Sequence, residues 1–124
     1  NEAKRLQQIA KEYGDFCSII YSDDVQFDLP KNPNIVFLSM KKLRGFDRIQ
    51  KLYTILSPSD LLYYANDRHG DGKSRLQFMD NCIVKVNQGQ KIDLTSINYT
   101  NDDWWKQFKI DCEEYNLFIA KKSQ

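Results

Sequence analysis

Residues 51–72 read KLYTILSPSDLLYYANDRHGDG, and their order of apolar and polar side chains decides the expected fold. Two runs, at 48–56 and 60–66, alternate between apolar and polar residues, and a Ser-Pro-Ser link joins them. Alternation with a period of two, bounded by Pro, Gly, Asn and Asp, is typical of antiparallel strands with one buried face. An Asp-Gly pair at 71–72 favours a tight turn after the second run. We therefore expect a meander of short strands.

The segments on either side of this stretch extend the β pattern. After the turn, five apolar residues share one parity within residues 72–87: Leu76, Phe78, Cys82, Val84 and Val86. This parity predicts a long strand or a bulged pair of strands. Before the stretch, residues 34–40 are apolar on both parities, which predicts a strand with both faces mostly buried. Residues 88–100 fit either another strand or a structured loop.

Residues 101–124 permit two interpretations. In the first, NDDWWKQFKIDCEEY forms a helix with Asn101 or Asp102 as its N-cap. In the second, residues 105–112 and 116–121 form a hairpin that turns at 113–115. The segments FKID and NLFIA are rich in strand-forming residues, and this favours the hairpin.

The N-terminal residues predict a helix that is followed by a linker. Leu6, Ile9 and Tyr13 recur at helical spacing, with charged and polar side chains on the other faces. Gly14 and Asp15 are a suitable helix stop. We assign residues 15–33 to a linker, because DLPKNPN at 28–34 has the Pro and Asn content of one. Within it, FCSIIYS at 16–22 fits either a short strand or a continued helix.

Composition limits the classes of function. The chain has 124 residues, enough for one domain with its own core. Its 18 basic and 17 acidic residues nearly cancel, so the net charge gives no argument for a nucleic-acid partner. Three widely spaced cysteines fit neither a disulfide framework nor a zinc site and indicate reduced, buried thiols. The sequence offers no acid–base pair, nucleophile–base pair or phosphate-binding loop, so we expect no enzymatic activity, cofactor or metal ion in this chain.

The order of these segments resembles a pleckstrin homology domain. The matching pieces are NIVFLSMKKL (34–43), RIQKLYTILS (48–57), DLLYYAND (60–67) and RLQFMDNCIVKV (75–86), and FKIDCEEYNLFIAKKSQ (108–124) resembles the family's fifth and sixth strands. The segment NEAKRLQQIAKEYG (1–14) resembles the end of the last helix of Dbl-homology domains. A helix, a linker and then a pleckstrin homology domain is the layout of Rho-family guanine nucleotide exchange factors.

The resemblance implies a mainly β fold, a bent antiparallel pleckstrin-homology-like barrel with a helix at its N-terminus. It divides the chain into the end of an upstream helix (1–14), a linker (15–33) and the pleckstrin-homology-like domain (34–124). The closing helix of that family is then expected after Gln124, or else the Trp104–Trp105 segment forms it.

The resemblance also implies a function. Such a domain regulates and targets an exchange factor at the cytoplasmic face of membranes, where it binds anionic phospholipid or phosphoinositide and contacts the catalytic domain or its Rho-family GTPase. The candidate lipid contacts are the cations of the basic hairpin: Lys41, Lys42, Arg44, Arg48 and Lys51. Leu52 stands where phosphoinositide-binding members often carry an arginine, which implies weak binding without headgroup selectivity.

Tyr63 and Tyr64 are candidate protein contacts. As neighbours in a strand they point to opposite faces, so we expect at most one in the core, which leaves the other available to an exposed interaction surface. An alternative function also stands, because the N-terminal helix taken alone fits the end of a coiled coil equally well. The chain is then a protein-interaction domain of similar shape, placed after a coiled coil, with no lipid or GTPase role.

Overall fold

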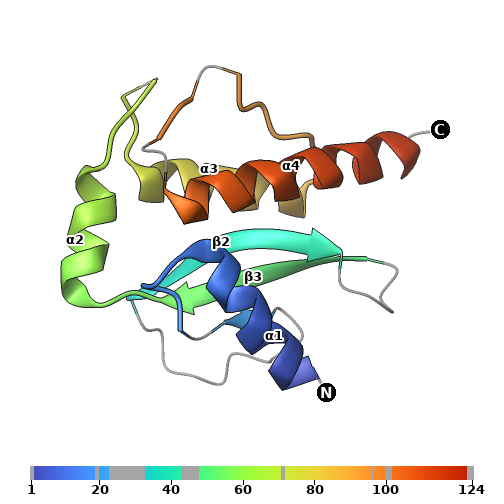
Figure 1. The fold of residues 1–124 in the computed structure, drawn as a ribbon. Coiled ribbons are helices and arrows are strands. Elements are labelled where there is room, and N and C mark those ends of the chain that lie inside the picture. The colour runs from blue at the N-terminus through green and yellow to red at the C-terminus, as the bar shows by residue number, and fades with distance from the viewer. Residues whose placement is uncertain are drawn as a thin grey trace.

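The computed structural model describes residues 2–18, 20–22, 33–42, 48–70, 72–95, 97–99 and 102–122. Its elements, in chain order, are α1 (Glu2–Ala10), the short 3-10 helix η1 (Lys11–Tyr13), β1 (Tyr21–Ser22), β2 (Ile35–Lys42), β3 (Ile49–Ile55), α2 (Pro58–Asn66), α3 (Arg75–Asn87) and α4 (Asp103–Lys122) (Figure 1).

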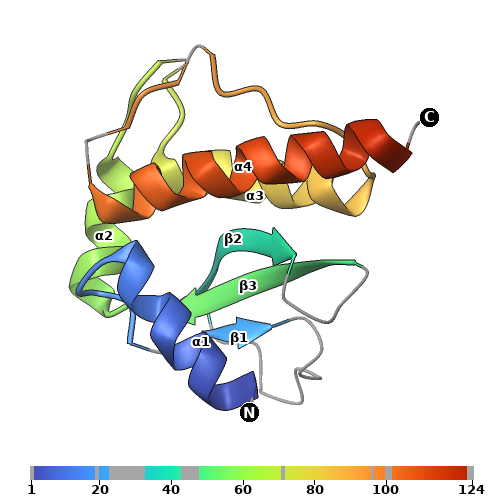
Figure 2. The ribbon, with the colours of Figure 1, turned by 45° about the vertical axis from the view of Figure 1, so that its right-hand side comes forward.

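The three strands form one antiparallel sheet in the order β1-β3-β2. Helix α4 runs along β2, and α3 lies beside α4 on the same side of the sheet (Figures 1 and 2). Helix α2 lies at one end of the molecule, where the chain passes from the sheet to the helical layer. The C-terminal end of α4 lies at the opposite end.

The expected helix at the N-terminus and the antiparallel pairing of β2 with β3 are confirmed. Four segments that the sequence analysis predicted as strands are helices instead. Residues 60–66 belong to α2, residues 75–87 to α3, and both arms of the expected hairpin at 105–121 to α4. Among the described residues, helix therefore exceeds strand, and the sheet is a small three-stranded layer covered by helices.

Local signals explain why α2 and α3 are helical. Ser57 caps α2 by accepting a hydrogen bond from the Asp60 amide at 3.1 Å, and proline occupies the first helical turn. Ser74 and Gln77 form a reciprocal capping box at the start of α3. The buried residues of α3 then recur at three and four positions, not at two.

Helix α4 settles the two interpretations of the C-terminal segment in favour of the helix. Asp102 Oδ1 accepts a hydrogen bond from the Trp105 amide at 2.7 Å, as an N-cap does. The buried side chains of α4 lie on one helical stripe: Trp104, Trp105, Phe108, Asp111, Cys112 and Tyr115. The Trp104–Trp105 segment is therefore the start of the long C-terminal helix.

The N-terminal segment belongs to the same core as the rest of the chain. Leu6, Ala10 and Tyr13, which the sequence analysis assigned to an upstream helix, are buried in the cluster that also holds the two tryptophans. Within the expected linker, Tyr21 and Ser22 form β1 and pair with β3, whereas residues 23–32 lie outside the described residues.

A bulge in β2 fixes the start of α4 on the sheet. The pairing of β2 with β3 shifts register between Phe37 and Ser39, so Leu38 has no partner in the ladder. The carbonyl oxygen of Leu38 instead accepts a hydrogen bond from Trp104 Nε1 at 2.8 Å. Because Leu38 has no partner in the β2–β3 ladder, its carbonyl oxygen can serve as the acceptor that the buried Trp104 indole needs.

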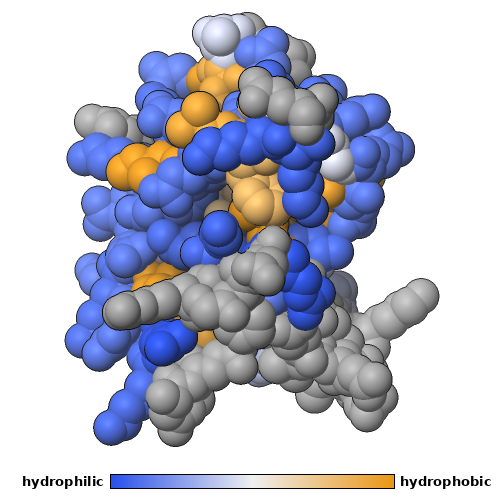
Figure 3. Space-filling view, turned by 90° about the vertical axis from the view of Figure 1, so that its right-hand side faces the viewer, coloured by the Kyte–Doolittle hydropathy of each residue, from blue (hydrophilic) through white to orange (hydrophobic). Residues whose placement is uncertain are grey.

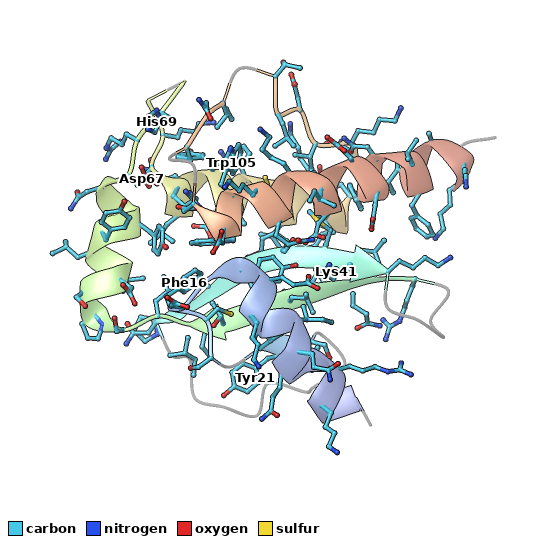
Figure 4. All side chains as sticks on the ribbon, in the orientation of Figure 1. Phe16, Tyr21, Lys41, Asp67, His69 and Trp105 are labelled. Carbon is cyan, nitrogen blue, oxygen red and sulfur yellow. The ribbon has the colours of Figure 1, made fainter. Side chains whose placement is uncertain are left out.

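A buried arginine holds the α2 end together. Arg75 Nη2 lies 3.2 Å from Asp67 Oδ2 and 2.9 Å from Asp102 Oδ2. The guanidinium carbon also lies between 4.8 and 5.7 Å from the ring centroids of four aromatic side chains, those of Tyr64, Tyr99, Trp104 and Trp105. Figure 4 shows Phe16, Asp67, His69 and Trp105 converging on this end from separate segments. Two carboxylates and several aromatic faces therefore compensate the desolvation of one cation.

A buried carboxylate joins α4 to β2 and η1. Asp111 Oδ2 accepts hydrogen bonds from Tyr13 Oη and Ser39 Oγ, both at 2.5 Å. Asp111 Oδ1 lies 3.1 Å from Lys41 Nζ and accepts a hydrogen bond from Gln107 at 3.1 Å. Ser39 and Lys41 both reach this carboxylate because alternate residues of a strand share a face.

Replacing Asp111 with alanine tests this network. We expect the free energy of unfolding to fall by about 3–5 kcal/mol, because the change leaves Tyr13, Ser39 and Lys41 without their shared acceptor. The control is Glu113→Ala, an exposed position on the same helix, which should stay within about 0.5 kcal/mol of the parent. Urea unfolding followed by circular dichroism measures both. Equal stabilities would contradict the role of the carboxylate.

Candidate functional site

Cations from two distant parts of the sequence meet at the end of the molecule where α4 finishes. Lys42 and Arg48 flank the β2–β3 connection, and Lys121 and Lys122 occupy the last turn of α4. Of the other expected lipid contacts, Lys51 and Lys41 line the same end, and Arg44 lies outside the described residues. We call the surface formed by Lys42, Arg48, Lys51, Lys121 and Lys122 the basic end.

Two neighbouring hollows shape the basic end, and they share the lining residues Ile49, Tyr115 and Phe118. One, of about 420 Å³, has Arg48, Lys51 and Lys122 among its lining residues. The other, of about 360 Å³, has Lys41, Lys42 and Lys121. The carboxylates that line them are Asp111 and Glu114. Among the described lining residues, six cations stand beside these two carboxylates, which makes the surface locally positive although the net charge of the whole chain is only +1.

Apolar side chains lie among these cations. The ring of Phe118 has Lys122 Nζ at 4.8 Å and Lys42 Nζ at 5.9 Å from its centroid. Leu117, the preceding residue, is 64% exposed. Figure 3 looks onto this end and shows apolar side chains set among hydrophilic ones. The surface therefore combines positive charge with exposed hydrocarbon.

Lys41 differs from its neighbour Lys42 because it points into the molecule (Figure 4). Its side chain is 17% exposed, and its ammonium lies 3.1 Å from Asp111 Oδ1 and 3.2 Å from Glu12 Oε2. Burial alone would lower the pKa of Lys41, but the two carboxylates outweigh this effect and raise it. Lys41 is therefore a charged structural residue that ties η1 to α4, and Lys42 is the residue of the pair that faces outward.

The two candidate tyrosines lie on α2, at the opposite end from the cations. Tyr64 is buried, whereas Tyr63 is 55% exposed, so at most one of them is a core residue, as expected, although they are neighbours in a helix and not in the predicted strand. The rings lie 5.0 Å apart, nearly perpendicular to each other. Tyr63 and the exposed Leu62 line a shallow hollow together with Ser59 and Asn66. The structure therefore separates the candidate protein contact from the candidate lipid contacts.

Sequence reasoning missed the contribution of α4 to the basic end. It treated residues 116–121 as a strand, so it did not connect Lys121 and Lys122 with the β2–β3 cations. The helical spacing of the buried residues Phe108, Cys112 and Tyr115 would have revealed it. Continuing that stripe brings Ile119 against the core and leaves Phe118 and the two lysines at the end of the helix.

The remaining reactive groups are enclosed or scattered. Burial raises the pKa of all three thiols, that of Cys82 to about 12, which keeps them protonated. Among the described residues, no cluster of three or more His, Cys, Asp or Glu side chains has the geometry to hold a metal ion. Within the same residues, no helix has the length and apolarity needed to cross a bilayer.

Comparison of the chain with models of protein families, with curated proteins and with solved structures finds no match.

The network around Lys41 makes a prediction about alkaline pH. Burial and the nearby Asp111 carboxylate raise the pKa of Tyr13 above the value of about 10 for an unfolded tyrosine. The stabilisation that comes from the protonated Tyr13 hydroxyl is complete below about pH 10. Above about pH 10, Tyr13 loses its proton in the unfolded state but keeps it in the folded state. Stability then falls by about 1.4 kcal/mol per pH unit from this group.

Tyr13→Phe removes this group and should flatten the decline. We expect the difference in free energy of unfolding between parent and variant to be largest below about pH 10 and to shrink as the pH rises further. Urea unfolding of both proteins between about pH 8 and about pH 11 measures this difference. Parallel pH profiles would show that the Tyr13 proton is not retained by the folded state.

Proposed function

We propose that this chain binds the surface of anionic phospholipid membranes peripherally, through the basic end. The observation that carries the proposal is the convergence of Lys121 and Lys122 from α4 with Lys42 and Arg48 from the β2–β3 hairpin. Two pairs of cations from distant parts of the sequence lie on one end of the molecule, and among the described residues the carboxylates that line the same hollows are Glu114 and Asp111, the latter paired with Lys41.

The expected binding is weak and sensitive to salt. Each lysine or arginine close to an anionic leaflet contributes about 1 kcal/mol, and this attraction falls off within a Debye length of about 8 Å at physiological ionic strength. The hollows are shallow, and their cations are mostly lysines, which contact phosphate as point charges without a fixed hydrogen-bonding geometry. Binding should therefore follow the negative charge of the membrane more than the identity of a headgroup.

The proposal is confined to the membrane surface. The pleckstrin homology resemblance places strands at DLLYYAND and RLQFMDNCIVKV, but these segments form α2 and α3. The likeness therefore lends no support here to regulation of a Rho-family exchange factor. The alternative function, a protein-interaction domain, has one favourable observation, the exposed Leu62 and Tyr63 on α2, and it predicts no dependence on lipid charge.

Charge reversal at the basic end tests the proposal. In co-sedimentation with vesicles of phosphatidylcholine and phosphatidylserine, Lys42→Glu/Lys121→Glu/Lys122→Glu should bind about 100-fold more weakly than the parent, since three attractions of about 1 kcal/mol each are lost. The parent should pellet far less with pure phosphatidylcholine vesicles, which offer no electrostatic attraction.

The control carries the same change in net charge elsewhere. Lys11, Lys73 and Lys106 are exposed and lie outside the hollows of the basic end. Their triple replacement by glutamate should weaken binding far less than reversal at the basic end. Equal losses in the two triple variants would mean that net charge, and not this surface, governs binding. No pelleting of the parent at low salt would overturn the proposed function.

A further inference from the structure

The basic end exposes apolar side chains as well as cations, and electrostatic attraction alone does not account for them. Leu117 is 64% exposed, and the partly exposed Phe118 separates the two hollows between the lysines. Both lie on α4, less than two turns before its end at Lys122. Ordinary surface leucines occur singly, but here a leucine and a phenylalanine are adjacent and have cations on several sides.

The arrangement of the lysines suits the boundary between lipid headgroups and acyl chains. Lys42 and Lys122 approach the Phe118 ring from different elements, and Lys121 follows one helical turn after Leu117. A lysine next to apolar surface can keep its methylenes on that surface while its ammonium reaches outward to a phosphate. Amphipathic helices at membranes bury an apolar face about 5–10 Å into this boundary while cations contact anionic lipids.

We propose that the basic end penetrates the membrane interface, with Leu117 and Phe118 entering the headgroup–acyl boundary while Lys42, Lys121 and Lys122 contact lipid phosphates. The inference rests on the function proposed above and adds to it an orientation and an apolar contribution. The molecule then meets the bilayer with the C-terminal end of α4, and α2 lies on the side away from it (Figure 1).

A bilayer fits these residues better than a single-stranded nucleic acid. A base can stack on the ring of Phe118, but Leu117 has no aromatic face and gains nothing from stacking. Both side chains gain from transfer out of water into the lipid interface. The apolar contribution is also insensitive to salt, so penetration predicts residual binding under conditions that screen the lysines.

A fluorescent probe at position 117 tests penetration directly. Leu117→Cys is labelled with an environment-sensitive nitrobenzoxadiazole group, and Leu62→Cys is labelled in the same way as the matched control. Leu62 is also 64% exposed but lies on α2, at the other end of the molecule. The parent, whose three cysteines are buried, should take up little label and sets the background.

On addition of phosphatidylserine-containing vesicles, the probe at 117 should shift its emission to shorter wavelength and become brighter, and the probe at 62 should not change. If both probes stay unchanged while the labelled proteins pellet with the vesicles, the penetration inference fails and the proposed function stands. If neither labelled protein nor the parent pellets, both fail. Displacement of the protein from vesicles by a polyuridine oligonucleotide, without any change at 117, would assign the surface to nucleic acid and overturn the inference.

A second variant separates penetration from charge. Leu117→Asn/Phe118→Asn keeps every cation and should bind vesicles about tenfold more weakly than the parent at high salt, where the apolar contribution remains. At low salt the lysines strengthen the binding of both proteins, and the ratio of their dissociation constants should stay about the same. Circular dichroism confirms that the variant is folded. Equal binding of variant and parent at high salt would exclude an apolar contribution.

Discussion

The fold depends on one buried carboxylate. Asp111 lies inside the molecule between α4, β2 and η1, where an unpaired charge would cost several kcal/mol. Hydroxyl groups of Tyr13 and Ser39 and the ammonium of Lys41 satisfy it from two other elements. These three residues therefore have to reach the same point, and this requirement fixes how the N-terminal segment and the sheet sit against α4. The pairing of Lys41 also decides that Lys42, the next residue of the strand, faces outward.

The cations at the two ends of the molecule have opposite environments, buried and paired at the α2 end and exposed at the basic end. At the α2 end, the buried Arg75 is neutralised by Asp67 and Asp102 and surrounded by aromatic rings, so it presents no charge to a partner. At the basic end, the lysines of α4 and β2 lie against Phe118 and beside Leu117. Of the two acidic residues among the described lining of these hollows, Asp111 is paired with Lys41, and the other is Glu114. The result is a polarity along the molecule that a net charge of +1 does not reveal. An anionic surface would orient such a molecule before contact.

The sequence was sufficient for the elements whose periodicity is unambiguous. The N-terminal helix was predicted from apolar residues at helical spacing, and the β2–β3 pair from a short apolar run and an alternating run on either side of a basic turn. Residues 60–66 were not, because in so short a run of leucines and tyrosines an alternating pattern and a helical one are equally satisfied. The capping box of Ser74 and Gln77 would have identified α3, and it was overlooked in favour of a shared parity. Other features had no local signal. The burial of Arg75 depends on partners from several segments, and the basic end exists only once α4 is a helix.

The lysines at the end of α4 serve the fold as well as the proposed surface. Asp102 and Asp103 stand at the start of this helix, and Lys121 and Lys122 at its end, which complements the helix dipole at both termini. Each terminal cation stabilises the helix by roughly 0.3–1 kcal/mol, so the same charges have a structural reason to be there. The helix dipole does not explain the residues that surround these lysines. They are an exposed leucine, a phenylalanine between two ammonium groups, and cations from a separate hairpin on the same end. It is this combination that a membrane interface would recognise.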